Sequence, residues 1–208
     1  MSEAFSNDIA QAAEVLARGG VVVFPTETLY GLGVDAASEP ALERLAVLKG
    51  REAAKPVSIL VDSRAMLDTW VSSVPESAER LMKEFWPGPL TLALPARPHV
   101  SKRLTGSGGS IAVRISSHSL AQRLVTRLGR PLTATSANPG GLVPASTVTE
   151  AKRYFGSEID VYLDGGTLRG GPGSTVIDVC GDRPVLLREG AIPAEAIEEA
   201  AGVRFVGR

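Results

Sequence analysis

Segments rich in hydroxyl, glycine and cationic residues follow or end several apolar stretches of this chain. They span residues 25–33, 49–56, 111–114, 135–141, 173–175 and 187–190. Hydroxyl and backbone N–H groups bind phosphate oxygens, and arginine and lysine neutralise their charge. In layered α/β proteins, ligands commonly bind where strands end. The set of segments therefore predicts a site for a polyanionic ligand, with a nucleoside triphosphate as the first candidate.

Two arginines stand directly after apolar stretches. Arg114 follows residues 111–113, and Arg188 follows residues 185–187. An arginine at the end of a buried strand needs a partner, because burying an unpaired charge is unfavourable. A ligand and a buried carboxylate explain both positions equally well, so the sequence leaves this choice open.

The other polar residues of these segments also have structural explanations. Thr26, Thr28, Ser136 and Asn138 are residue types that form turns, and Lys49 can complement the C-terminal end of a helix. Any one segment taken alone favours the structural explanation, whereas the collection favours a ligand site.

Several familiar sites are absent from the sequence. It contains neither a Gly-x-x-x-x-Gly-Lys-Ser/Thr loop nor a Gly-x-Ser-x-Gly elbow. Two histidines, His99 and His118, with the single Cys180 do not favour a structural zinc site, and no protein-held metal is expected. A lone cysteine forms no internal disulfide, and no apolar run approaches the ~20 residues that cross a membrane. The N-terminus carries no signal-peptide pattern, so we expect a cytoplasmic protein.

Apolar periodicity and breaker residues predict alternating helices and strands. A first helix is expected to start after a cap at Asn7 or Asp8 and to end at Gly19-Gly20. Further helices are expected at 39–48 with Ser38 as cap, 65–70, 77–85, 120–128, 148–155 with a Thr147–Glu150 capping box, and 193–201. Strands are expected at 21–24, 57–61, 90–94, 111–115, 132–135, 161–163, 175–179 and 185–187, and residues 163–174 are expected to be a loop. This alternation predicts an α/β or α+β layered fold in one domain spanning residues 1–208.

The same segments, in this order, resemble the YrdC-like family of threonylcarbamoyl-AMP synthases. The resemblance rests on Pro-Thr-Glu-Thr-Leu-Tyr-Gly-Leu at 25–32, Lys-Gly-Arg at 49–51, Trp-Pro-Gly-Pro-Leu-Thr at 86–91, Val-Arg at 113–114, Ser-Ala-Asn at 136–138, Ser-Thr-Val-Ile at 174–177 and Leu-Arg at 187–188. It extends from about residue 15 to residue 188, and its distribution over many segments makes it specific. Longer family members carry a further C-terminal domain, so this chain resembles the short, single-domain form.

The resemblance implies a twisted, largely open sheet flanked by helices, with a deep concave site. It implies that ATP contacts Arg51, Lys55, Ser110, Arg114, Ser136, Asn138 and Arg188. It implies that threonine is held by Thr28 and Ser174, with help from the backbone near Ala134. Lys49, Arg51 and Arg114 are expected to act in catalysis, and Mg²⁺ is expected to accompany the triphosphate.

The implied activity is that of an L-threonylcarbamoyladenylate synthase, a nucleotidyltransferase. The amine of threonine attacks CO₂ supplied by bicarbonate, and the resulting carbamate attacks the α-phosphorus of ATP and releases pyrophosphate. No protein nucleophile is required, which suits a chain whose conspicuous polar residues are Lys, Arg, Ser and Thr. The product would serve a downstream threonylcarbamoyl transferase that modifies tRNA.

Two positions depart from the family pattern. Many members have a histidine where Leu60 stands and an asparagine where Lys55 stands. Because Leu60 cannot form a side-chain hydrogen bond to a substrate, we expect threonine to be held mainly by Thr28, Ser174 and backbone groups. Discrimination against serine should then be modest.

Three other functions compete with this one. An RNA-binding module is disfavoured by the net charge of −1 and by the absence of basic-aromatic stretches, so only weak RNA binding is expected. The second rival is carbamoyl transfer in hydrogenase maturation, where a similar domain occurs together with zinc-finger domains. A chain of 208 residues with one cysteine leaves no room for those additional domains. A nucleotide-binding relative without turnover is favoured if ATP binds but threonine does not.

Overall fold

The computed structural model describes residues 2–50 and 56–205, with side chains from Asp8 onward. Its strands are β1 (Val22–Pro25), β2 (Tyr30–Gly33), β3 (Ile59–Leu60), β4 (Leu90–Pro95), β5 (Ser110–Arg114), β6 (Leu132–Thr133), β7 (Thr135–Ser136), β8 (Val161–Tyr162), β9 (Thr175–Asp178) and β10 (Val185–Arg188). Its α-helices are α1 (Ser2–Ala17), α2 (Glu39–Leu48), α3 (Arg64–Asp68), α4 (Glu76–Phe85), α5 (Lys102–Thr105), α6 (Ser119–Leu128), α7 (Val148–Phe155) and α8 (Ala194–Ala201). The predicted mixture of helices and strands is confirmed.

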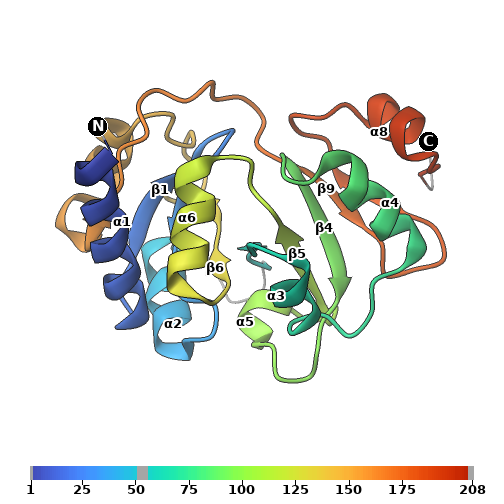
Figure 1. Ribbon diagram of the computed structural model, residues 1–208, viewed down its shortest axis with the longest axis horizontal. Helices are drawn as coiled ribbons and strands as arrows, with labels where there is room; N and C mark the ends of the chain where they lie inside the picture. The colour runs from blue at the N-terminus through green and yellow to red at the C-terminus, as the bar shows by residue number, and fades with distance from the viewer. Residues whose placement is uncertain (1, 51–55, 206–208) are drawn as a thin grey trace.

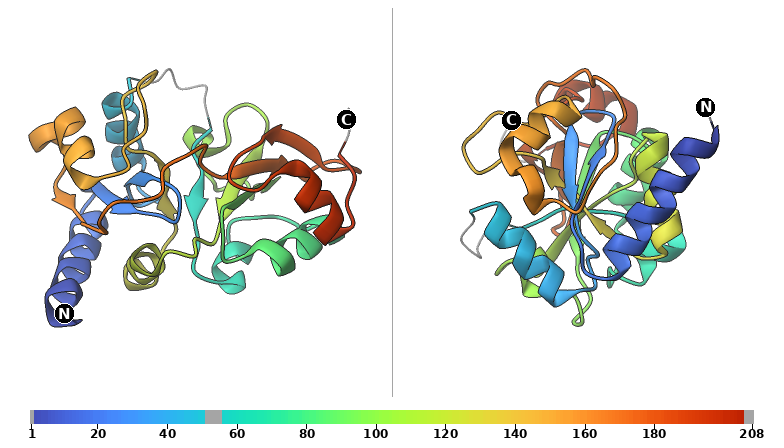
Figure 2. Two further views of the ribbon diagram at one scale, coloured as in Figure 1. Left: turned by 90° about the horizontal axis from the view of Figure 1, so that it is seen from above. Right: turned by 90° about the vertical axis from the view of Figure 1, so that its left-hand side faces the viewer.

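The strands form two sheets rather than the single twisted sheet that we expected. The four-stranded sheet has the order β7-β2-β1-β8, and the six-stranded sheet has the order β10-β9-β4-β5-β3-β6. Both sheets mix parallel and antiparallel neighbours: β1 is antiparallel to β2 but parallel to β8, and β4 is antiparallel to β5 but parallel to β9. The two sheets lie side by side along the long axis of the molecule, with helices around them (Figures 1 and 2).

Strand β1 lies between two hydrophobic clusters. Val23 belongs to the larger cluster, which extends through both sheets, whereas Val22 and Phe24 belong to the smaller one beneath α1 and α6. Successive side chains of a strand point to opposite faces, so an uninterrupted apolar run is what a strand covered on both faces requires. Helix α1 packs against α6 on the outside of the smaller cluster (Figure 1).

The link between the two sheets lies at Ala134. The sequence predicts one strand over 132–135, but the structure divides it into β6 in one sheet and β7 in the other. The N–H of Ala134 donates to the carbonyl oxygen of Ser58 at 2.8 Å, and Ser58 Oγ donates to the carbonyl oxygen of Ala134 at 2.7 Å. This crossing places the polar residues that flank Ala134 between the sheets.

The helix signals in the sequence were mostly correct. Ser38 caps α2, and Thr147 and Glu150 form the predicted capping box of α7. The predicted cap at Asn7 or Asp8 is wrong, because α1 already begins at Ser2. The intervening residues include alanine and glutamate, which favour helix, so the polar pair is simply part of the helix. None of the helices in the described part of the chain is both long and apolar enough to span a bilayer.

Strand β2 was not predicted, since its sequence Tyr-Gly-Leu-Gly looks like a loop. The glycines have a packing role there, because the ring of Phe24 lies against both of them. A Cβ on Gly31 would come within 3.0 Å of that ring, and one on Gly33 within 2.7 Å. Glycine in a strand often marks such a close approach.

Candidate functional site

A cavity of about 290 Å³ opens between the two sheets. The four-stranded sheet contributes β2, β7 and the turn before β2, while the six-stranded sheet contributes β4, β5, β9 and β10. Of the residues predicted to bind ATP or threonine, the cavity wall contains Thr28, Ser110, Arg114, Ala134, Ser136, Ser174 and Arg188. Segments as far apart in the chain as residues 28 and 188 are thus brought to one surface. This convergence is what the segment pattern predicted.

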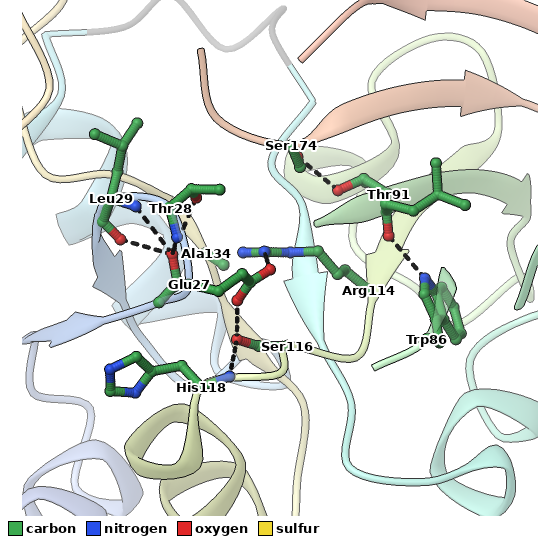
Figure 3. Close-up of polar contacts among 12 residues, drawn as sticks. Glu27, Thr28, Leu29, Trp86, Thr91, Arg114, Ser116, His118, Ala134 and Ser174 are labelled. Carbon is green, nitrogen blue, oxygen red and sulfur yellow. Dashed lines mark hydrogen bonds and ion pairs between the residues drawn. The ribbon is translucent and has the colours of Figure 1, made fainter. Parts of the chain in front are cut away.

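Arg114 is paired with a buried carboxylate, which answers the question that the sequence left open. Nη1 of Arg114 donates to Oε1 of Glu27 in an ion pair whose side chains are only 7% and 15% exposed. Ser116 Oγ donates to the second oxygen of Glu27 and itself accepts the backbone N–H of His118 at 3.2 Å (Figure 3). Sequence reasoning missed Glu27, although it lies inside the Pro-Thr-Glu-Thr segment that carries the resemblance.

The electrostatics of Arg114 follow from this environment. Burial lowers the pKa of Arg114, the Glu27 carboxylate acts in the opposite direction, and the charge of Arg188 lowers it further. Burial also lowers the pKa of Arg188. Arginine remains protonated in proteins even so. The cavity therefore holds two guanidinium groups close enough to repel each other.

In the same six-stranded sheet as Arg114, Arg188 holds the backbone and side chain of Ser174. Its Nη2 donates to the Ser174 carbonyl oxygen at 2.7 Å and to Oγ at 3.2 Å, and its Nε donates to the same carbonyl at 3.2 Å. Ser174 Oγ also lies 2.9 Å from Oγ1 of Thr91, a hydroxyl that is buried at the cavity wall (Figure 3). Thr91 was quoted for the resemblance but was not predicted as a site residue. A Cβ on Gly190 would lie 2.4 Å from the Ser174 backbone, so this wall needs glycine there.

Thr26 and Thr28 differ in what they do. Thr26 Oγ1 donates to the carbonyl oxygen of Leu29 at 2.6 Å and accepts the N–H groups of Thr28 and Leu29 at 3.3 Å each. Thr26 is therefore the turn residue that the structural explanation foresaw. Both threonines line the cavity, and Oγ1 of Thr28 lies 3.2 Å from Oγ1 of Thr26.

Two predicted residues, Lys49 and Asn138, are absent from the cavity wall. Lys49 is 2% exposed, and its ammonium group donates to the carbonyl oxygens of Ser136, at 2.6 Å, and of Asn138. The side-chain amide of Asn138 donates to the carbonyl oxygens of Pro139 and Leu142. Both side chains therefore shape the loop that presents Ser136. Lys49 does cap the end of α2, but its charge is directed at this loop.

The remaining sequence-based expectations have varied outcomes. Arg51 and Lys55 lie outside the described residues. Leu60 is 1% exposed and packs in the smaller hydrophobic cluster, outside the cavity wall. His118 caps α6, as expected of a residue at a helix start. Cys180 is an exposed loop residue whose Sγ lies 3.5 Å from the carbonyl oxygen of Ala93.

Chemically, the wall offers guanidinium groups, hydroxyls and backbone groups. This set suits an anionic ligand that also presents hydrogen-bonding groups. Among the residues that the structure describes, no three His, Cys, Asp or Glu side chains gather in a group that could hold a metal ion.

Known proteins share this sequence and this fold. The Sua5_yciO_yrdC family profile, described as "Telomere recombination", matches residues 14–190. A Pyrococcus abyssi protein named threonylcarbamoyl-AMP synthase is 42% identical over 92% of this chain and 56% of its own length. One from Thiobacillus denitrificans with the same name is 40% identical over 86% of this chain and 96% of its own length.

A solved structure matches as well. The crystal structure of P. abyssi Sua5 complexed with L-threonine superposes with a TM-score of 0.90 at 41% identity, over 95% of this chain and 58% of that chain. This chain thus spans less than two thirds of the length of its P. abyssi relative.

Proposed function

The chain belongs to the Sua5/YciO/YrdC family, and we propose that it is an L-threonylcarbamoyladenylate synthase, a nucleotidyltransferase. It would join L-threonine, bicarbonate and the AMP part of ATP, and it would release pyrophosphate. The observation that carries this proposal is the cavity that gathers Arg114, Arg188 and several hydroxyls from both sheets. The product would be passed to a threonylcarbamoyl transferase acting on tRNA.

The reaction has two bond-forming steps. The threonine nitrogen attacks the carbon of CO₂, which bicarbonate supplies, and loses a proton to give a carbamate. A carbamate oxygen then attacks the α-phosphorus of ATP, and the bond from that phosphorus to pyrophosphate breaks. Neither step needs a covalent bond to the protein, so the enzyme would act by positioning and by stabilising charge.

The cavity residues fit these roles. Arg114 and Arg188 would stabilise the charge that develops on the phosphoryl oxygens and on the departing pyrophosphate. Thr28 and Ser174 would hold threonine together with the backbone at Ala134. Ser110 and Ser136 would contact ATP, and so would Arg51 and Lys55.

Two predicted residues take altered roles in this proposal. Lys49 and Asn138 would act on ATP through the loop that carries Ser136, because their polar groups are directed at its carbonyl oxygens. Mg²⁺ would enter as part of the substrate, the Mg·ATP complex. Its ligands would be phosphate oxygens and water, as is usual for Mg²⁺ bound with a nucleotide.

The test is a product analysis with isotope-labelled bicarbonate. With Mg·ATP, L-threonine and labelled bicarbonate, the protein should release pyrophosphate and form an acyl-adenylate that contains the labelled carbon. Omitting threonine or bicarbonate should stop pyrophosphate release. Equal release without either compound would refute the proposal. ATP binding without any threonine-dependent turnover would support a nucleotide-binding relative, and salt-dependent RNA binding without turnover would support an RNA-binding module.

A further inference from the structure

Arg114 is held by a side chain that is not itself part of the cavity wall. The wall contains Arg114 and the neighbouring Thr26 and Thr28, but not Glu27. The Glu27 carboxylate meets the guanidinium at Nη1 (Figure 3). A guanidinium is a rigid, planar fork with several N–H donors, so a contact at one nitrogen leaves donors for a ligand in the cavity.

Glu27 is itself fixed on its second oxygen. Ser116 Oγ donates to Oε2, and the hydroxyl is fixed in turn by the N–H of His118, the residue that caps α6. The contacts therefore form a chain from the start of a helix to the guanidinium in the cavity. Each oxygen of the carboxylate has its own donor, which defines where the carboxylate lies and hence where Nη1 lies.

Among the described contacts, the Glu27 carboxylate is the acceptor that holds the guanidinium of Arg114 in place. The charge of Arg188 repels this guanidinium, and burial disfavours its charged form. A long, unpaired cationic side chain in that position would turn away from Arg188 or towards solvent, because its rotamers are no longer restricted.

We propose that Glu27 is a positioning residue that fixes the guanidinium of Arg114 in the orientation that binds a polyphosphate chain. This inference rests on the proposed function only in its choice of ligand class. Glu27 touches neither substrate in this scheme and acts through Arg114. Its contribution lies in the hydrogen-bond geometry of the carboxylate rather than in its charge, since a negative charge near a phosphate binding site by itself disfavours the anion.

A pair of variants separates geometry from charge. Glu27→Gln and Glu27→Ala both remove the negative charge, but only glutamine keeps an oxygen that can accept from Arg114 and an amide that can donate to Ser116. We expect Glu27→Gln to bind ATP at least as tightly as the wild type. Glu27→Ala should bind ATP about tenfold or more weakly than Glu27→Gln, which corresponds to the loss of one hydrogen bond to a charged group.

The same comparison in an Arg114→Ala background shows whether Glu27 acts through Arg114. Without the guanidinium, Glu27→Gln and Glu27→Ala should bind ATP within about twofold of each other, because only coupled residues give non-additive effects. If Glu27 had a merely structural role, the ratio of the ATP affinities of Glu27→Gln and Glu27→Ala would be the same in this background as in the wild type. Glu27→Met, which fills the volume without a hydrogen-bonding group, replaces Glu27→Ala if the alanine variant does not fold.

The measurement is isothermal titration of each variant with Mg·ATP and, in parallel, with inorganic triphosphate. The inference would be overturned if Glu27→Ala and Glu27→Gln bound ATP with equal affinity. It would also be overturned if their affinities differed by the same factor in the Arg114→Ala background. A wild-type protein that binds neither compound would overturn it as well. Failure of the proposed function alone looks different: ATP binds and the variants behave as described, but threonine and bicarbonate elicit no pyrophosphate release.

Discussion

Lys49 offers a sharp test of how the loop that presents Ser136 is held, because its ammonium group donates to backbone carbonyl oxygens of that loop. Lys49→Met keeps the length of the side chain and removes the donor. The carbonyl oxygens of Ser136 and Asn138 would then lose this donor. A buried acceptor left without its donor costs about 1–3 kcal/mol. The carbonyl oxygen of Ser136 would still accept the N–H of Asn138 at 2.9 Å, so only the carbonyl oxygen of Asn138 loses its described donor. The free energy of unfolding should therefore be about 1–3 kcal/mol lower than that of the wild type.

The assay is equilibrium unfolding in urea, monitored by tryptophan fluorescence. It is combined with an ATP titration of the folded variant. Lys83→Met is the matched control, since Lys83 lies in the last turn of α4, much as Lys49 follows the end of α2, but is exposed. The control should lie within about 0.5 kcal/mol of the wild type. A Lys49→Met protein of wild-type stability and ATP affinity but without turnover would refute this reasoning, because Lys49 would then act on the reacting groups directly.

Three further predictions follow from single contacts. Thr91→Val removes the hydroxyl that lies 2.9 Å from Ser174 Oγ, so KM for threonine should rise about five- to tenfold; an unchanged KM would show that Ser174 needs no such support. Burial lowers the pKa of His118, against the opposing effect of the Glu27 carboxylate. The free energy of unfolding should therefore fall as the pH drops below about 6.5, the pKa of a histidine in an unfolded chain. His118→Asn still caps the helix, so it should reduce the difference in this free energy between pH 7 and pH 5, measured by urea titration. Although Cys180 is an exposed residue, partial burial of its thiol and the neighbouring Asp178 raise the pKa of Cys180 to about 12. Iodoacetamide should therefore alkylate it at pH 8 at least about a hundredfold more slowly than an ordinary thiol, while Cys180→Ser should keep its activity. Alkylation at the ordinary rate would contradict that assignment.

Elements with a clear periodicity or a cap could be placed from the sequence. Helices α2 and α7 have side-chain caps that act within four residues, so the sequence contains all the relevant information. Strand β2 could not be recognised, because the reason for its glycines is the ring of Phe24 on the neighbouring strand. The division of residues 132–135 into two strands likewise depends on Ser58, far away in the chain.

In the candidate site, too, the sequence predicts features that depend on nearby residues but not features that depend on residues far away in the chain. Residue types at strand ends identified most of the cavity wall, because such ends converge in a layered fold. The direction of a side chain could not be predicted in the same way. Lys49 and Arg114 are both buried cations in motif segments, yet one is directed at loop carbonyls and the other at a carboxylate. Only partners distant in sequence distinguish these two roles.

The electrostatics of the cavity explain why the two arginines at its wall are held by different kinds of acceptor. Burial disfavours the charged form of both Arg114 and Arg188, and the two charges repel each other. Arg114 is stabilised by a carboxylate, whereas the described contacts of Arg188 are neutral oxygens of Ser174. A second fixed carboxylate beside Arg188 would stabilise the charge of this arginine, but it would also repel an anionic ligand. Neutral acceptors hold Arg188 in place while leaving its charge available, so the wall combines one guanidinium paired with a carboxylate and one held by neutral oxygens. An entering polyanion would relieve the repulsion between them. A ligand that binds only the folded protein stabilises it by an amount that grows with the logarithm of the ligand's affinity.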